Sequence, residues 1–206
     1  EDGADLLVRL AYQTHSMKLI AWDVDDTLND LMREWLEKWF LPRNRRCRTA
    51  YSGLRDNPPH KALGISLDAY LRSYDEFRLS AVYDELLPSP EALAWFRRSG
   101  SRYRHNAVTA VPLAAAHRSA GWIYRHFGRW IRTFHIVPSP RKGQALPRYE
   151  ATKAGFLKSI GGCGLFVDDS PRNVRQAAAA GLRSALVPRP WNCAPGTPAE
   201  FFRSLK

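Results

Sequence analysis

A short apolar run at residues 18–22 ends abruptly in three aspartates, Asp23, Asp25 and Asp26. An uninterrupted apolar run of this length is typical of a strand buried on both faces, as in the centre of a parallel sheet. Carboxylates this close repel one another, so a cation or a set of backbone donors must compensate their charge. A divalent metal such as Mg²⁺ would do so and would keep positions open for a phosphate. An acidic turn after a strand is the simpler alternative.

The composition limits the class of protein. A chain of 206 residues fits one domain with an insertion or a small cap, and 45% hydrophobic with 25% charged residues is typical of a soluble globular protein. No apolar stretch approaches the roughly 20 residues that span a bilayer, so no membrane association is expected. Residues 1–16 lack a secretory signal, which favours the cytoplasm. Cys47, Cys163 and Cys193 are widely spaced and predict reduced thiols, not a disulfide framework or a zinc site.

The formal charge of +11 is the one unusual bulk property. It is compatible with a polyanion such as nucleic acid, with a small anionic substrate, or with a solvated basic surface that has no specific partner. Charge alone does not choose among these three.

Residues 31–87 predict a small, mostly helical insertion. Apolar residues recur there at intervals of three to four, first around Trp35 and Trp39 and again around Tyr70 and Tyr74. These aromatic side chains are more typical of a core than of a ligand platform. A basic, irregular piece at 41–61 lies between the two helical patterns.

The rest of the chain alternates between strands and helices, which predicts an α/β fold with a parallel sheet and right-handed crossovers. The amino-terminal extension, residues 1–16, contains a possible short helix at 4–13, and the tail from 188 onward shows only a possible turn at 201–202. The expected strands are 18–22, 103–109, 133–137, 165–167 and 184–187, and the expected helices are 91–100, 112–127, 151–160 and 171–180.

Three of these strands end in groups suited to one chemical task. Asp23 and Asp25 follow the first, Thr109 ends the second, and Asp168 with Asp169 follows the fourth. A parallel sheet brings such ends to one edge, where ligands bind. The carboxylates would hold a metal there, while the Thr109 hydroxyl and nearby amides donate to a phosphate.

A lysine would complete this arrangement, because phosphoryl transfer needs a cation besides the metal. Lys153 opens the helix that leads into the Asp168 strand, so it is the best placed candidate. Lys142, in the loop after the third strand, and Lys158, on a later helical turn, are competitors.

At these positions the chain resembles the haloacid dehalogenase (HAD) superfamily of Rossmann-like aspartyl phosphatases. The resemblance covers residues 18–190 and rests on four motifs in order, Asp23-Val-Asp-Asp-Thr27, Ala107-Val-Thr109, Lys153 and Val167-Asp-Asp-Ser-Pro-Arg-Asn173. It implies a three-layer α/β/α sandwich with strand order 5-4-1-2-3. It also implies a core formed by 17–28 and 89–206 and a helical C1 cap at 29–88.

The resemblance also implies roles for individual residues. Asp23 would be the nucleophile that forms an aspartyl phosphate, and Asp25 the general acid and base. Mg²⁺ would be bound by the Asp23 side chain, the Asp25 carbonyl and Asp168, with Asp169 acting through water. Thr109, Ala110 and Lys153 would hold the phosphoryl group.

Other residues have open or local roles. Thr109 is alternatively only a strand-end hydroxyl, and Asp26 is expected to bond local backbone. Asn173 is a candidate for orienting Asp169 or Lys153, or an ordinary surface residue. Arg43 and Arg46 lie in a run typical of a solvated loop; if they face the site, they favour a substrate with charge beyond one phosphate.

The sequence thus predicts a Mg²⁺-dependent phosphomonoester hydrolase that acts on a small phosphorylated metabolite or nucleotide. Dehalogenase chemistry is not expected, because the dehalogenases of the superfamily lack the second aspartate. A nucleic-acid end phosphatase or binding protein is the first alternative, although no helix-turn-helix, zinc finger or aromatic RNA-binding signature is present. A catalytically silent regulatory domain is the second.

Overall fold

A computed structural model describes residues 18–137, 139, 141, 142, 144, 147 and 149–206 of the chain. The extension at 1–16 and the helix expected at 4–13 lie outside these residues. The basic loop expected at 138–149 is only partly within them.

The centre of the molecule is a parallel sheet of five strands in the order β3-β2-β1-β4-β5. This confirms the α/β class and the strand order expected from the sequence. β1 occupies the middle because its residues are apolar on both faces. The third strand begins two residues earlier than expected, because Ile131 already pairs with His105 of β2. The strands are β1 Leu19–Trp22, β2 Arg104–Thr109, β3 Ile131–Ile136, β4 Cys163–Asp168 and β5 Ser184–Leu186.

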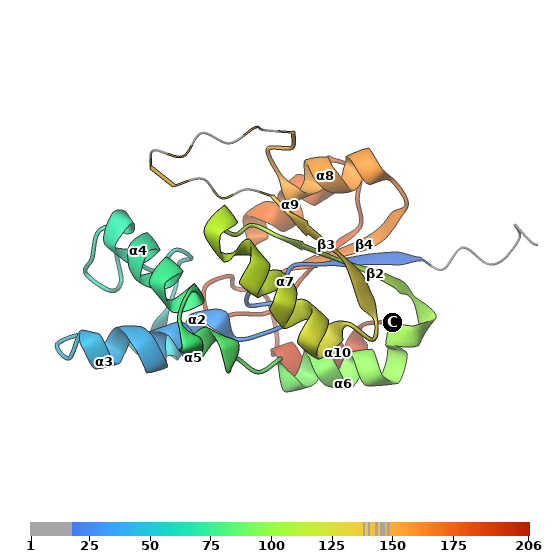
Figure 1. Ribbon diagram of the computed structural model, residues 1–206. Helices are drawn as coiled ribbons and strands as arrows, with labels where there is room; N and C mark the ends of the chain where they lie inside the picture. The colour runs from blue at the N-terminus through green and yellow to red at the C-terminus, as the bar shows by residue number, and fades with distance from the viewer. Residues whose placement is uncertain (1–17, 138, 140, 143, 145–146, 148) are drawn as a thin grey trace, which may run out of the picture.

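Helices cover both faces of the sheet, which gives three layers (Figure 1). Successive residues of β1 point to opposite faces, so Trp22 packs in one hydrophobic cluster and Ala21 in another. The cluster around Trp22 includes residues of α6 (Pro90–Ser99), α7 (Leu113–Phe127) and α10 (Pro198–Ser204). The cluster around Ala21 includes residues of α8 (Lys153–Ile160) and α9 (Pro171–Ala179).

The helix α10 replaces the turn expected at 201–202. It begins with a capping box in which the Thr197 side chain accepts a hydrogen bond from the Glu200 N–H and the Glu200 carboxylate accepts one from the Thr197 N–H. The helix then places Phe202 against Trp22, with 6.3 Å between ring centroids. The tail therefore contributes to the core.

Residues 31–84 form the helical insertion, with no strand among them. The insertion leaves and rejoins the core at one place, where the Ser89 N–H donates to the Leu28 carbonyl at 2.8 Å. Its elements are α2 (Leu31–Glu34), a π-helix (Trp35–Phe40), α3 (Leu41–Arg43), a 3₁₀ turn (Tyr51–Gly53), α4 (Leu67–Arg78) and α5 (Ala81–Asp84).

The aromatic residues of the insertion form its own core, as expected. The Trp35 ring lies 5.2 Å from that of Tyr70 and 5.3 Å from that of Tyr74, and all three side chains are buried. Trp39 is half-buried and packs against Phe77. The division of the chain into a catalytic core and a cap stays a prediction.

No helix in the described part of the chain is long and apolar enough to cross a bilayer. Cys47, Cys163 and Cys193 are all free, as the sequence predicted.

Candidate active site

Three buried carboxylates meet where β1 and β4 end. Asp23 follows β1, and its N–H donates to the Val167 carbonyl of β4 at 2.8 Å, so the two strand ends are held side by side. Asp168 is the last residue of β4, and Asp169 comes next. Because β1 and β4 are neighbours in the sheet, carboxylate oxygens of Asp23, Asp168 and Asp169 lie within 4.8 Å of one another. The sheet topology thus joins residues separated by more than a hundred positions.

Lys153 lies between two of these carboxylates. Thr152 caps α8 by accepting a hydrogen bond from the Gly155 N–H, which places Lys153 in the first turn. Its Nζ is 2.6 Å from Asp23 Oδ1 and 2.8 Å from Asp168 Oδ2. The two competing lysines, Lys142 and Lys158, are both exposed.

Burial is the largest single effect on the pKa values of Asp23 and Asp169 in the cluster. Burial raises the pKa of Asp23 well above its usual value, while the Lys153 ammonium partly offsets this. Burial and then the Asp168 charge raise the pKa of Asp169 to about 8. Burial works to lower the pKa of Lys153, but the Asp168 and Asp23 carboxylates outweigh it and raise the pKa.

The donor set fits a divalent cation. With all groups ionised, three carboxylates and one lysine leave a formal charge of −3 + 1 = −2 in a buried site. Carboxylate oxygens are the ligands that Mg²⁺ prefers, and a charge of +2 would neutralise the cluster. Burial, the main cause of the raised pKa values of Asp23 and Asp169, disfavours their charged forms, and a bound cation would favour those forms.

A second layer of polar side chains holds Asp168 and Asp169. Asn173 donates through Nδ2 to Asp168 Oδ1 and Oδ2 at 3.2 and 3.0 Å, so it orients Asp168 and not Asp169 or Lys153. The Trp191 indole donates to Asp169 Oδ2 at 3.0 Å, and Asn192 Nδ2 donates to the Asp169 carbonyl at 2.7 Å. Trp191 and Asn192 belong to the tail in which the sequence showed no usable pattern.

Asp25 pairs with the insertion and is not one of the three carboxylates that meet at the strand ends. Arg78, the last residue of α4, donates to Asp25 Oδ2 at 2.6 Å, and both side chains are largely buried. The Arg78 guanidinium also stacks on the Tyr74 ring, 4.4 Å from its centroid. Asp25 Oδ1 has no hydrogen-bond partner in the described part of the chain. The sequence analysis did not identify Arg78.

Asp26 has a local structural role, as expected. Its backbone has a positive φ of 59°, a conformation that aspartate tolerates better than most residues. Its Oδ1 accepts a hydrogen bond from the Met32 N–H, and its carbonyl accepts one from Arg189 Nε at 2.6 Å. Burial raises the pKa of Asp26 to about 7, against the Arg189 charge. Arg189 also pairs with Asp30 and fixes the start of the insertion.

The remaining sequence-predicted residues lie in different places. Thr109 is 1% exposed at the end of β2, the strand next to β1, and Ala110 follows it at the surface. Arg43 donates to the Trp39 carbonyl and stacks on the Trp39 ring. It is the last residue of α3, the helix at the outer end of the insertion in Figure 1. Arg46 is exposed beside it. The role of Arg43 and Arg46 in substrate binding stays a prediction.

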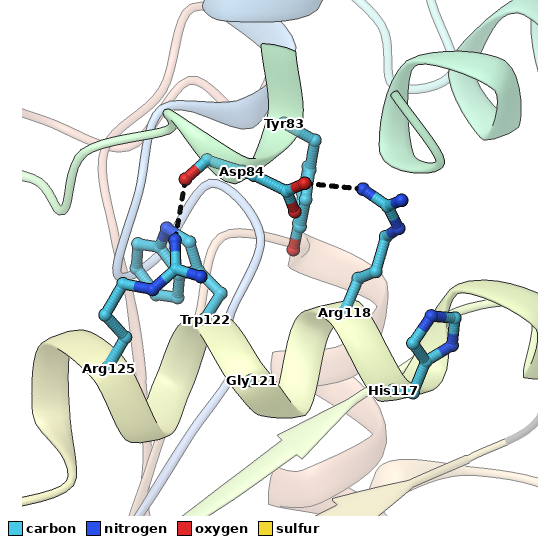
Figure 2. Close-up of a pocket in the computed structure, with 7 residues that line it drawn as sticks. All are labelled: Tyr83, Asp84, His117, Arg118, Gly121, Trp122 and Arg125. Atoms are coloured by element: carbon cyan, nitrogen blue, oxygen red, sulfur yellow. Dashed lines mark hydrogen bonds and ion pairs between the residues drawn. The ribbon is translucent and has the colours of Figure 1, made fainter. Parts of the chain in front are cut away.

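A separate pocket of about 290 Å³ lies between α5 and α7 (Figure 2). Arg118 donates to Asp84 Oδ2 at 2.8 Å, and Arg125 donates to the Asp84 carbonyl at 2.8 Å. Behind them Trp122 donates to the Leu86 carbonyl at 2.6 Å. These contacts tie the insertion to the core.

The sequence matches no family model and no curated protein. Solved structures do match it. A haloacid dehalogenase-like hydrolase from Streptococcus pneumoniae aligns with a TM-score of 0.57 at 13% identity, over 91% of both chains. A HAD-superfamily subfamily IA hydrolase from Geobacter sulfurreducens aligns at 0.50 and 17%, over 89% of this chain and 90% of that one.

A third structure, a suggested phosphoglycolate phosphatase from Lactobacillus plantarum, aligns with a TM-score of 0.51 at 17% identity. The alignment covers 91% of this chain and 99% of that one. The chain therefore has the fold of the haloacid dehalogenase-like hydrolases.

Proposed function

We propose that this protein is a Mg²⁺-dependent phosphomonoester hydrolase with Asp23 as its nucleophile. The observation that carries the proposal is the meeting of Asp23, Lys153, Asp168 and Asp169 at the carboxyl ends of β1 and β4. Ligands bind at this edge in open parallel sheets. The substrate class we propose is a small phosphorylated metabolite or a nucleotide.

The contacts of Asp23 suit nucleophilic attack. Asp23 Oδ1 accepts a hydrogen bond from the Val24 N–H at 2.7 Å and forms an ion pair with Lys153 at 2.6 Å. Both contacts are to Oδ1, which leaves Oδ2 as the oxygen to attack phosphorus. Attack would form an aspartyl phosphate and release the alcohol, and water would then hydrolyse the acyl phosphate.

Asp25 would move the proton in both steps. It would protonate the leaving alcohol first and deprotonate the attacking water second. Arg78 holds Oδ2 at 2.6 Å, so the unpartnered Oδ1 is the oxygen that would carry the proton. Thr109 and Lys153 would bind the phosphoryl oxygens. Mg²⁺ bound by Asp23, Asp168 and the Asp25 carbonyl, with Asp169 nearby, would offset the charge of phosphate and carboxylates.

The insertion at 29–88 would act as a cap on this core. Its ends meet at Leu28 and Ser89, and α4 brings Arg78 to Asp25. A cap in this position would exclude water from the acyl phosphate and contact the part of the substrate beyond the phosphate. The cytoplasmic location expected from the sequence also stays a prediction.

The test is phosphate release from p-nitrophenyl phosphate and a panel of phosphorylated metabolites, with Mg²⁺ and with EDTA. We expect turnover only with Mg²⁺ and a loss of at least about 10³-fold in Asp23→Asn, since removal of a nucleophile leaves only binding and electrostatic effects. Asp56→Asn, an exposed aspartate of the insertion, is the matched control and should retain activity. A folded protein without turnover on any phosphoester would favour the catalytically silent domain.

A further inference from the structure

A second cavity lies at the opposite edge of the sheet, where β1, β2 and β3 begin. Its volume is about 770 Å³, within the range of small-molecule binding sites. Leu19, Arg104 and Thr133 line it from the three strands, and Ile160 lines it from the end of α8. In Figure 1 this edge is at the right of the sheet, where β1 begins. The carboxylate cluster follows the other ends of β1 and β4.

The lining of this cavity carries positive charge that no acidic lining residue neutralises. Arg104, Arg129 and Arg132 are among them, and none of the lining residues is acidic. All three arginines are exposed, and none forms an ion pair within the described residues. Three like charges around one cavity raise the local potential and favour an anion there.

A buried amide in the same cavity supplies an independent observation. Asn106 lies on β2, is 3% exposed and lines the cavity. Its Oδ1 has no hydrogen-bond partner in the described part of the chain. Buried side-chain amides are almost always hydrogen-bonded, so this one needs a partner that the described residues do not provide. A ligand with N–H or O–H donors would be such a partner.

Aromatic side chains complete the lining. Tyr103 and Trp130 are half-buried at the cavity, and the Arg129 guanidinium lies 5.8 Å from the Trp130 ring centroid. A nucleotide combines the features that this lining would recognise. Its phosphates would pair with the arginines, its base would pack against an aromatic ring, and its amino or hydroxyl groups would donate to Asn106.

We propose that this cavity binds a nucleoside di- or triphosphate at a site separate from the proposed phosphatase centre. The proposal does not depend on the proposed function, because it uses none of the carboxylate-site residues. A nucleotide at this site would explain part of the excess of basic residues in the chain.

The test is calorimetric titration of the full chain with ATP, with inorganic tripolyphosphate and with adenosine, in EDTA so that no Mg²⁺-dependent hydrolysis occurs. ATP should bind more tightly than either of its two parts. Replacing Arg104, Arg129 and Arg132 together with glutamine should weaken ATP binding by at least about tenfold, because charge-assisted contacts to phosphate are lost. Asn106→Leu should weaken ATP binding and leave tripolyphosphate binding unchanged.

The matched control replaces three exposed arginines outside the cavity, Arg97, Arg175 and Arg183, with glutamine, which changes the net charge equally. Its ATP affinity should stay within about twofold of the original protein. Circular dichroism confirms folding, and Arg132→Gln alone replaces the triple variant if that variant unfolds. Equal weakening in both triple variants, tripolyphosphate binding as tight as ATP binding, or no ATP binding would each overturn the proposal.

Discussion

The two sides of the candidate active site are held together in different ways. On the core side, Lys153 pairs with both Asp23 and Asp168. Asn173 donates to Asp168, and Trp191 donates to Asp169. On the insertion side, Arg78 reaches across to Asp25. Several hydrogen bonds and ion pairs therefore hold the core side together, whereas the contact between the insertion and Asp25 depends on a single arginine.

This difference separates two tasks in the proposed reaction. Groups that must keep a fixed geometry for bond making lie on strand ends and the first turn of α8, which are rigid elements. Arg78, which contacts the proposed acid and base Asp25, lies on α4. This helix belongs to the insertion, which joins the core through a few contacts. Changes on the core side should therefore abolish activity, whereas changes on the insertion side should modify it.

After loss of the Asp23 nucleophile, the largest effect is expected from removing the central cation of the core side. Lys153→Met leaves Asp23 and Asp168 buried without their shared partner, and it removes one proposed contact to the phosphoryl group. We expect kcat/KM to fall by about 10²–10³-fold, the usual cost of losing one charge-stabilising donor.

Lys158→Met is the matched control, because Lys158 lies on the same helix but is exposed. Its activity should be unchanged. An equal loss of activity in both variants would indicate damage to α8 and would contradict the proposed role of Lys153. Steady-state kinetics with Mg²⁺ and thermal melting of both variants make this comparison.

The core side was largely predictable from the sequence, because strand ends fix where a side chain must lie. Once Asp23 and Asp168 were placed after neighbouring parallel strands, their meeting followed from topology. Lys153 followed from its position at the start of α8. The hydrogen-bond partner of Asn173 could not be predicted, because a side-chain hydrogen bond depends on rotamers that sequence spacing does not determine.

The insertion side and the tail were not predictable in the same way. Arg78 looked like any other basic residue at a helix end, because its contact with Asp25 depends on how the insertion docks on the core. Trp191 and Asn192 lie in an irregular segment without periodicity. One signal was present, however: they follow β5, whose carboxyl end lies at the same edge as the site. Thr197 and Glu200 likewise have the spacing of a capping box and could have revealed α10.

Metal and pH should reveal the uncompensated charge of the core side. The folded-state pKa of Asp169 is raised from 3.8 to about 8, so the metal-free protein binds more protons than the unfolded chain between these values. Without metal, the contribution of Asp169 to stability should therefore be largest below about pH 4. It should decrease as the pH rises toward 8. Bound Mg²⁺ should remove this loss.

Thermal melting at pH 5 and pH 8, with EDTA and with Mg²⁺, measures the effect. Mg²⁺ should stabilise the protein more at pH 8 than at pH 5. At pH 8 the total stabilisation should be about 2–3 kcal/mol when Mg²⁺ is at a hundred times its dissociation constant. In Asp169→Asn the dependence of the EDTA melting temperature on pH should be weaker. Equal stabilisation by Mg²⁺ at both pH values would argue against a metal bound by these carboxylates.

A smaller effect is expected from the arginine of the insertion side. Arg78→Ala removes a charged hydrogen bond to Asp25 and should lower kcat by about tenfold, as expected for one charge-assisted contact. Arg72→Ala, an exposed arginine on the same helix, is the matched control and should behave like the original protein.

The pH profile of kcat distinguishes a positioning role from a structural one. If Arg78 acts on Asp25, Arg78→Ala should shift the profile, and Arg78→Lys should restore part of the activity by restoring the charge. A lower melting temperature with an unchanged profile would mean that Arg78 only stabilises the insertion.

The smallest effect is expected where the insertion is tied to the core at α7. Asp84→Ala removes the ion pair with Arg118, in which the two side chains are 47% and 29% exposed, so about 0.2–1 kcal/mol is expected. The Arg125 contact uses the Asp84 backbone carbonyl and survives the substitution. Trp122→Phe removes a buried hydrogen bond to the Leu86 carbonyl and should cost more. Urea unfolding ranks the two variants; a larger loss in Asp84→Ala would show that the exposed ion pair, and not the buried indole, holds the insertion in place.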